Sequence, residues 1–370
     1  MIITSIEELR LSSPAHALDS IDGLVGFIDN SEHDFLEDKL GTPLYEALCK
    51  WYDQNNTVRS NVSDYQTGYW NRLLLLAQRC VAFDALGRAI GMQAISVNNA
   101  GINVSVADDY PAPDKNGKTI DLYRDTCTKE AHAALNQLLR QLEQWCKKTA
   151  PDDTDAEANS QLSNNSPVTL QLLDSERREI VTLWKESRYY YLAAALLIPS
   201  CEVLQSYLNI YDSREKFIQL LPDLRFIQEE IIANSIGEDL LKVVIDFARD
   251  GKVPTDNTES EGTAVATSQF SIPNSQLTEP TLIRLVLRLR KVMVALLISR
   301  TSVLRYDKEK KIQAHDDGVR MLANVTEYLK SLVPSQPSSQ PPSNLPRGKE
   351  NPDIRHQTSD SAACWTPPIL

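Results

Sequence analysis

The sequence predicts a mainly α-helical protein with two duplicated helical units, the first of which also carries a small β-hairpin. Three observations lead to this expectation. Glycine is scarce, at 13 of 370 residues. Long segments repeat apolar residues at the three- and four-residue spacing of a helix. Four features of the first part of the chain recur in the same order in the second part, which indicates an internal duplication.

The first recurring feature is the opening of each unit. IITSIEEL (Ile2 to Leu9) is similar to LIPSCEVL (Leu197 to Leu204), with an isoleucine, a serine, a glutamate and a leucine in step. This agreement is one of the four features that indicate the duplication.

The second feature is a pair of helices separated by a glycine. It occurs in FLEDKLGTPLYEAL (Phe35 to Leu48) and again in IIANSIGEDLLKVV (Ile231 to Val244). A glycine at positive φ ends a helix easily, and proline favours the first position of the next one. We expect Thr42 to cap the second helix of the first pair. The predicted turn residues are Gly41, Thr42, Pro43 and Gly237.

A long helix and a closing helix complete each unit. Apolar stripes predict long helices over 68–90 and 281–302, and closing helices over 129–147 and 318–332. Between the two helices of the first unit, apolar and polar residues alternate around Asn98-Asn99-Ala100-Gly101, which predicts a hairpin near 94–106. The second unit has a highly charged segment there instead, 304–317.

Composition divides the chain into five parts. Segments rich in Asp, Ser, Thr, Asn and Pro lack the apolar residues needed for a packed core, so they are expected to be disordered. The predicted parts are a first helical unit (1–146), a disordered linker (147–166), a joining helix (167–196), a second helical unit (197–333) with a disordered insertion (252–279), and a disordered Pro/Ser-rich tail (334–370).

Several functional classes find no support. The net charge of −12 gives the whole chain no attraction for nucleic acid or an anionic membrane, and no apolar run is long enough to cross a bilayer. Motifs for dinucleotides, phosphate loops, zinc proteases and serine hydrolases are absent. Paired carboxylates such as Glu7-Glu8 are interpreted as solvated surface. No catalytic residue, cofactor or metal site is predicted, and the scattered cysteines are interpreted as buried apolar residues.

A basic ridge stands out against the acidic background. Arg284, Arg288 and Lys291 have the spacing of one helix face, opposite a leucine stripe. Such a ridge can be a solvated surface, can lie near DNA phosphates, or can bind an acidic protein partner. Aromatic residues that would stack on bases are almost absent from this segment, so sequence-specific recognition is not expected.

Aromatic residues mark two further candidate contacts. Trp184 is followed by Tyr189, Tyr190 and Tyr191 in the predicted joining helix. Three consecutive helical positions cannot all face one core, so at least one is expected in a contact between domains or subunits. Trp365 lies in the apolar end of the tail, which is interpreted either as a disordered end or as a docking motif.

The first unit resembles a known pattern. FLEDKLGTPLYEAL, a polar linker, the long helix RLLLLAQRCVAFDALGRAI and a short β element at GINV together resemble an uncharacterised family from phage and prophage gene clusters of Bacteroides-type bacteria. That family is similar in outline to the α-helical head-to-tail connector (adaptor) proteins of tailed phages. The resemblance is best over Phe35 to Glu143 and weaker over Leu197 to Leu332.

The resemblance implies a function through contacts. It implies a ring subunit without catalytic activity, made in the host cytoplasm and assembled into a virion or phage-like particle. The implied partners are further copies of the chain and portal- or neck-type proteins, with non-specific proximity to DNA and no membrane contact. One alternative is a cytoplasmic helical scaffold that binds a partner protein through its tail. An enzyme with an unfamiliar, dispersed site is the third.

Overall fold

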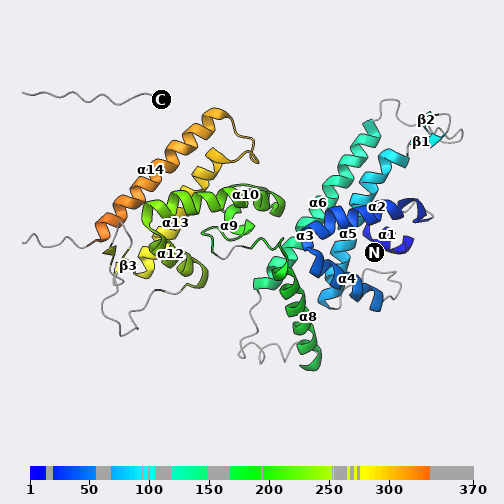
Figure 1. Ribbon diagram of the computed structural model, residues 1–370, viewed down its shortest axis with the longest axis horizontal. Coiled ribbons are helices and arrows are strands. Elements are labelled where there is room, and N and C mark those ends of the chain that lie inside the picture. The colour runs from blue at the N-terminus through cyan, green and yellow to red at the C-terminus, as the bar shows by residue number, and fades with distance from the viewer. Residues whose placement is uncertain are drawn as a thin grey trace, which may run out of the picture. The chain divides into compact units, whose positions relative to one another are not determined.

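The structure is a computed structural model, shown as a ribbon in Figure 1. It describes residues 1–13, 20–55, 68–93, 95–98, 101–104, 118–147, 167–192, 195–251, 253, 265–266, 271–272 and 276–333. The chain divides into two compact bodies, Met1–Val333 and Pro334–Leu370. The second body, which includes Trp365 and the predicted tail, lies outside the described residues.

The described residues of the first body are mainly helical, which confirms the predicted fold class. The first helical unit contains α1 (Ile6–Ser12), η1 (Asp22–Leu24), α2 (Val25–Ser31), η2 (Glu32–Glu37), α3 (Asp38–Leu40), α4 (Thr42–Gln54), α5 (Tyr69–Gln93), β1 (Ile95–Asn98), β2 (Gly101–Val104) and α6 (Lys118–Lys147). After α8 (Pro167–Glu186), the second contains α9 (Cys201–Gln205), α10 (Arg214–Phe226), η4 (Ile227–Ile232), α11 (Ala233–Ile236), α12 (Glu238–Asp250), β3 (Val265–Ala266), β4 (Ser271–Ile272), α13 (Glu279–Arg300) and α14 (Lys308–Leu332).

Both helical units are built on a pair of long helices. In Figure 1, α5 and α6 lie side by side, as do α13 and α14. The leucine stripe of α13 is buried as predicted, and α5 buries Leu73, Leu74 and Ala77 in the same way. Burial of these stripes is the main stabilising contribution of each unit, at roughly 25 cal/mol per Å² of apolar surface removed from water.

The opening of each unit is held by the same hydrogen bonds. Ile2 N donates to the side chain of Glu32 at 2.8 Å, and Gln78 Nε2 donates to Ile2 O at 2.7 Å. In the second unit, Leu197 N donates to Gln228 Oε1 at 2.8 Å, and Arg290 Nε donates to Leu197 O at 2.8 Å.

The helix after each of these non-helical openings is capped in the same way. Ser5 Oγ accepts from Glu8 N in α1, and Ser200 Oγ accepts from Val203 N in α9. Glu32 and Gln228 both lie on π-helical turns, η2 and η4, which are rare in proteins. These shared details are what a duplicated unit would produce, and the duplication itself stays a prediction.

The glycine turns also match. Gly41 has φ 83° and ψ 147°, and Gly237 has φ 91° and ψ 145°. Only glycine adopts this region readily, and each glycine precedes a helix of 13 residues. The positive φ expected at Gly41 is therefore confirmed.

The cap predicted at Thr42 is wrong by one residue. Gly41 O accepts the first hydrogen bond of α4, from Tyr45 N, so Gly41 holds the cap position and Thr42 is already helical. Thr42 Oγ1 instead donates to Glu37 at 2.7 Å. Pro43 lies in the first turn, where a missing N–H has no cost.

Several predicted boundaries differ from the structure. The closing helices begin earlier than expected, at Lys118 in α6 and Lys308 in α14. The charged residues before Gly318 are thus the exposed start of a helix, which needs few apolar positions. The joining helix predicted over 167–196 ends at Glu186, because Ser187 Oγ accepts a hydrogen bond from Tyr189 N in a turn.

Two segments have short antiparallel strands. β1 and β2 pair with Ile95 opposite Val104, within the segment for which the sequence predicts a hairpin. β3 and β4 pair inside 252–279, so the prediction that this whole insertion is disordered is wrong for these residues. Ile272 and Leu277 are buried there, which supplies the apolar anchor that the composition did not suggest. Most of the linker 147–166 lies outside the described residues.

Candidate interaction surfaces

The two helical units meet at a buried ion pair. Arg214, at the start of α10, and Glu143, on α6, are both fully buried, and Arg214 Nη2 lies 3.1 Å from Glu143 Oε2. Arg214 Nε also donates to this oxygen, at 3.2 Å. The backbone N of Arg214 donates to Asn136 Oδ1 at 2.9 Å. A buried charge is tolerated only when it is paired and hydrogen-bonded, and both conditions hold here.

Tyr191 completes this junction. Its hydroxyl donates to Glu143 Oε1 at 2.7 Å, and its ring packs edge-on against Phe217 of α10. Burial, together with the neighbouring Glu143 carboxylate, raises the pKa of Tyr191, so the phenol keeps its proton and remains a donor. Tyr191 thus contacts residues of both helical units, in line with the predicted contact between domains.

The other residues of the predicted aromatic contact behave differently. Trp184 is fully buried and packs edge-on against Tyr190 and Tyr191, so its side chain is covered within the chain. The three tyrosines follow the end of α8 and lie on no helix, so the expectation that they occupy consecutive helical positions is wrong. Tyr190 is half-buried, and Tyr189 is half-buried under the guanidinium of Arg188.

The turn before α10 aims Arg214 at Glu143. Tyr211 and Asp212 both have positive φ, at 61° and 52°, which is unusual for residues other than glycine. Gln205 Oε1 holds this turn by accepting from Ile210 N at 3.0 Å and from Asp212 N at 2.9 Å. Because Asp212 O in turn accepts from Arg214 Nη1 at 2.9 Å, the strained turn orients the buried guanidinium.

The basic ridge predicted from the sequence lies on an exposed face of α13. Arg284, Arg288 and Lys291 are all exposed, and among the described residues neither Arg284 nor Lys291 has an ion-pair partner. Two apolar side chains lie beside them, Ile283 at 44% and Leu287 at 46% exposure. We call these five residues the basic face. Its apolar part was not predicted from the sequence.

A groove runs between the basic face and α14. Arg288 lies 4.6 Å above the ring of Tyr328, and the groove encloses about 530 Å³. Its other lining residues are Lys291, Met321, Asn324, Glu327 and Ser331. The mixture of cationic, apolar and polar groups suits a peptide segment or a helix of another protein.

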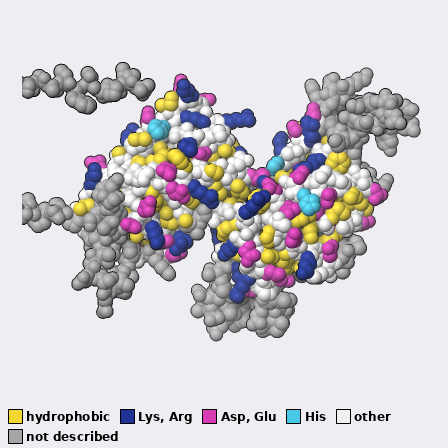
Figure 2. All heavy atoms as spheres, viewed as in Figure 1, with side chains coloured by type: hydrophobic (Ala, Val, Ile, Leu, Met, Phe, Trp, Pro, Cys, Tyr) yellow, Lys and Arg dark blue, Asp and Glu magenta, His cyan; other side chains and the backbone are white. Residues whose placement is uncertain are grey.

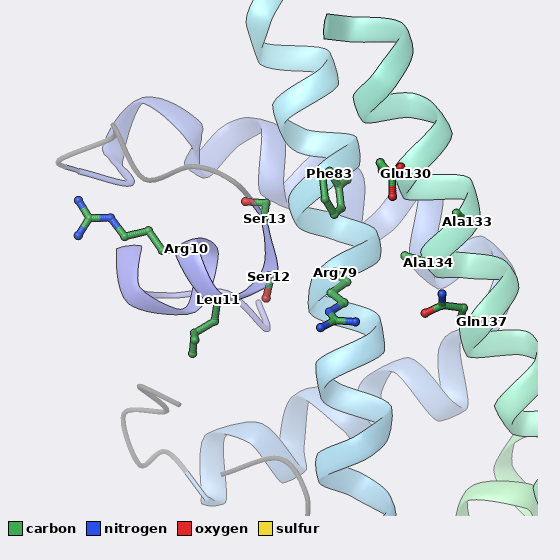
Figure 3. Close-up of a pocket in the computed structure, with 10 residues that line it drawn as sticks. All are labelled: Arg10, Leu11, Ser12, Ser13, Arg79, Phe83, Glu130, Ala133, Ala134 and Gln137. Atoms are coloured by element: carbon green, nitrogen blue, oxygen red, sulfur yellow. The ribbon is translucent and has the colours of Figure 1, made fainter. Parts of the chain in front are cut away.

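The first unit has a corresponding groove, shown in Figure 3. It encloses about 380 Å³ between Arg79 and Phe83 of α5 and Glu130, Ala134 and Gln137 of α6. The end of α1, Arg10 to Ser13, lies along its side, and Arg10 points away from the other labelled side chains. In the second unit the equivalent helix, α9, is shorter, with five residues against seven.

Charge on the surface is mixed. Figure 2 shows cationic and anionic side chains interspersed over the visible face, without one continuous basic area. The paired carboxylates predicted as surface are not all exposed, because Glu8 is buried and accepts from Tyr52 Oη at 2.7 Å. Glu8 and Glu32 are thus structural acceptors, a role that was not predicted from the sequence.

Among the described residues, no group of three or more His, Cys, Asp or Glu side chains is arranged to hold a metal ion. Cys80, Cys127 and Cys201 are buried thiols, and burial raises the pKa of the half-buried Cys146 to about 11. Cys364 lies outside the described residues. Of the helices in the described part of the chain, none is both long and apolar enough to cross a membrane.

Comparison with known proteins gives one family. Residues 36–148 match a family of unknown function (DUF6712). The matched segment runs from η2 to the end of α6, so it covers the long helix pair of the first unit and the surface that carries Glu143. No curated protein matches the chain. No solved structure matches it either.

Proposed function

We propose that this chain is a structural protein of a phage or prophage-derived particle, of the head-to-tail connector or adaptor type. In this role it forms a ring with other copies of itself, contacts portal- or neck-type proteins and catalyses no reaction. It would be made in the host cytoplasm and end in the assembled particle. The resemblance over Phe35 to Glu143 is the starting point for this proposal.

The basic face is the observation that carries the proposal furthest. Ile283 and Leu287 expose apolar surface next to two cations without ion-pair partners in the described chain. Interfaces between proteins combine apolar side chains with arginine in this way. An acidic surface with an apolar centre would therefore bind here. DNA phosphates would use the cations alone and leave the apolar side chains in water.

The buried junction supports the same role. Glu143 and Arg214 link the helical units through fully buried, charge-assisted hydrogen bonds. A subunit that transmits contacts between neighbours needs such a link, because relative motion of its halves would separate the surfaces that bind together. The polar groups of the junction are directed at one another.

The test is capture of portal- and neck-type proteins encoded beside this gene. The full chain is co-purified with each candidate, and the Leu287→Glu and Arg288→Glu variants are compared with it. Arg225→Glu, which changes the same charge at an exposed position of α10, is the matched control. Capture by the wild type and the control, but not by the two basic-face variants, is expected. No capture of any neighbour would overturn the connector assignment.

DNA binding is tested separately. If the basic face binds duplex DNA, affinity falls steeply with salt, and Arg288→Glu weakens it while Leu287→Ala does not. That result would mean that the partner of the basic face is DNA and not a protein. The alternative of a cytoplasmic scaffold depends on residues 334–370, which lie outside the described structure. Loss of capture on deleting those residues, with the basic-face variants still active, would favour the scaffold.

A further inference from the structure

A cavity of about 440 Å³ lies at the start of α9. Its lining residues come from the ends of α6 and α8, the segment between α8 and α9, the start of α9, the last turns of α12, and α13. Residues of both helical units and of the joining segment therefore meet there. A space of this size between parts of a protein is typical of a small-molecule site, so the chemistry of its walls can be compared with that of a ligand.

The equivalent place in the first unit is filled by Tyr52. This side chain is buried, and its hydroxyl lies 2.7 Å from Thr4 Oγ1 and donates to Glu8 Oε2 at 2.7 Å. Ala248 follows the glycine turn of the second unit at the same interval as Tyr52 follows that of the first. Ala248 lines the cavity. The cavity is thus present where an alanine stands in place of a large aromatic ring.

The polar partners of Tyr52 are also replaced in the second unit. Thr4 and Glu8 correspond to Pro199 and Val203, because each pair holds the same place around its capping serine. Pro199 and Val203 both line the cavity, and neither side chain can hydrogen-bond a hydroxyl. This wall therefore suits an apolar group of about the size of the missing tyrosine ring.

Arg290 brings a charge to the cavity that its structural role does not require. In the first unit, the neutral side chain of Gln78 donates to Ile2 O, and Arg290 Nε makes the equivalent hydrogen bond to Leu197 O. Among the described residues, the two Nη nitrogens of Arg290 have no further hydrogen-bond partner, and this partly exposed side chain lines the cavity. Paired N–H donors of a guanidinium are suited to a carboxylate or a phosphate.

Three other cations line the cavity, and two of them are already neutralised. Lys147 is paired with Glu202, which also lines the cavity, and Arg249 is paired with two aspartates of its own helix. Lys185 has no ion-pair partner in the described part of the chain. The positive charges of Lys185 and Arg290 therefore remain available for an anion beside the apolar wall.

We infer that this cavity binds a small anionic molecule in which a carboxylate or phosphate group is joined to an apolar body of about the size of a tyrosine ring. The anion pairs with Arg290 and Lys185, and the apolar body lies against Pro199 and Val203 in the space left by Ala248. Because Lys185 is on the joining helix and Arg290 is on α13, the ligand holds these two parts together. This inference does not depend on the proposed ring or its protein partners.

The experiment is calorimetric titration of the full chain with 3-phenylpropanoate and with 2-phenylethyl phosphate, which carry one apolar body on the two kinds of anion. Binding at a single site is expected, and the tighter probe identifies the anionic group. Phenylpropanol lacks the charge and inorganic phosphate lacks the ring, so each should bind about tenfold or more weakly. Inorganic phosphate that binds as tightly as its phenylethyl ester would contradict the role of the apolar wall.

Two variants place the residue of the first unit in the second. Arg290→Gln keeps a donor for the backbone, as Gln78 does, so it should lower the affinity about tenfold without a loss in the free energy of unfolding. Ala248→Tyr should fill the cavity and abolish binding. Urea unfolding of both variants shows whether the fold is retained.

Lys185→Gln and a matched control complete the test. Lys185 is exposed, so its replacement should weaken binding about tenfold and leave the fold intact. Arg225→Gln removes an exposed cation of α10 that does not line the cavity, and it should bind like wild type. Absence of binding by both probes, or an affinity that Arg290→Gln leaves unchanged, overturns the inference. Neither result alters capture of portal-type proteins through the basic face, so the two proposals fail separately.

Discussion

Glu32 and Gln228 each accept a hydrogen bond from the backbone of a non-helical segment, at 2.8 Å in both helical units. Each lies on a π-helical turn, and the held segment leads into a helix capped by a serine. The two side chains differ in charge. Glu32 also accepts from Tyr45 Oη at 2.7 Å, whereas Gln228 donates from Nε2 to Ala195 O at 2.9 Å.

Replacing Glu32 with glutamine, the residue at the equivalent position of the second unit, gives the first prediction. Glu32→Gln keeps an oxygen for Ile2 N and places an amide N–H near Tyr45 Oη, which can turn to accept. Glu32→Leu leaves both buried donors without a partner, at about 1 to 3 kcal/mol each. Urea unfolding should therefore give a small loss of stability for Glu32→Gln and a loss of several kcal/mol for Glu32→Leu. Equal losses for the two variants would contradict the shared hydrogen-bond role.

Much of this repeated pattern could be predicted from the sequence. Helical periodicity and the glycine between two apolar runs were sufficient for the element order, since both are local signals. The hydrogen bonds that Glu32 and Gln228 accept could not be predicted, because their donors lie about thirty residues away along the chain. Glu8 was misread for the same reason, because its burial depends on Tyr52 of another helix.

Any side chain at position 41 is expected to lower the free energy of unfolding. The φ of 83° at Gly41 with ψ near 150° costs a non-glycine residue about 1 to 3 kcal/mol. A Cβ there would also lie 1.8 Å from Ser187 Oγ. Gly41→Val is therefore expected to lower the free energy of unfolding by more than the backbone cost alone, as measured by urea titration.

Two further variants separate the cost of the positive φ from the cost of the clash with Ser187. Gly41→Ala combined with Ser187→Gly should recover the part due to the clash and leave the backbone part. Gly26→Ala is the matched control, since Gly26 is helical and a Cβ there meets nothing within 4 Å. This control should be neutral or stabilising by up to about 1 kcal/mol. A Gly41→Val protein as stable as wild type would refute the packing seen at Ser187.

The buried junction predicts strong coupling between Arg214 and Glu143. Arg214→Met leaves the Glu143 carboxylate buried without its cation, which typically costs about 3 to 5 kcal/mol. Adding Glu143→Leu removes the orphaned charge, so the double variant should regain much of that loss. A double-mutant cycle in urea measures the coupling. Additive losses in the cycle would mean that water reaches the pair and that the junction is looser than the structure indicates.

Only the cationic part of the basic face could be predicted from the sequence. The spacing of Arg284, Arg288 and Lys291 identified a basic ridge on one helix face, and these residues are exposed there. Ile283 and Leu287 were missed, because an apolar residue next to a leucine stripe is usually buried by a neighbour. Whether a neighbouring element covers such a residue depends on tertiary contacts, so a single sequence does not reveal it.

The last prediction concerns pH at the rim of the junction. His132 Nδ1 lies 2.7 Å from Glu215 Oε2, linking α6 to α10. The hydrogen bond to Glu215 raises the pKa of His132, and the charges of Glu215 and Asp84 act in the same direction against partial burial. The folded pKa is above the unfolded one, near 6.5. The stabilisation is therefore complete below about pH 6.5 and is lost as pH rises through the folded pKa.

The measurement compares wild type with His132→Asn from about pH 5 to about pH 8 by urea unfolding. The wild type should be more stable than His132→Asn at the acidic end, and this difference in the free energy of unfolding should shrink towards the basic end. His33, whose pKa is also raised by its hydrogen bond to Glu37, titrates in both proteins and cancels in the difference. Glu215→Gln should reduce the pH dependence of that difference, leaving the smaller part that comes from Asp84. A difference that is constant with pH would show that His132 contributes only by packing against Phe35, whose ring lies 5.4 Å away.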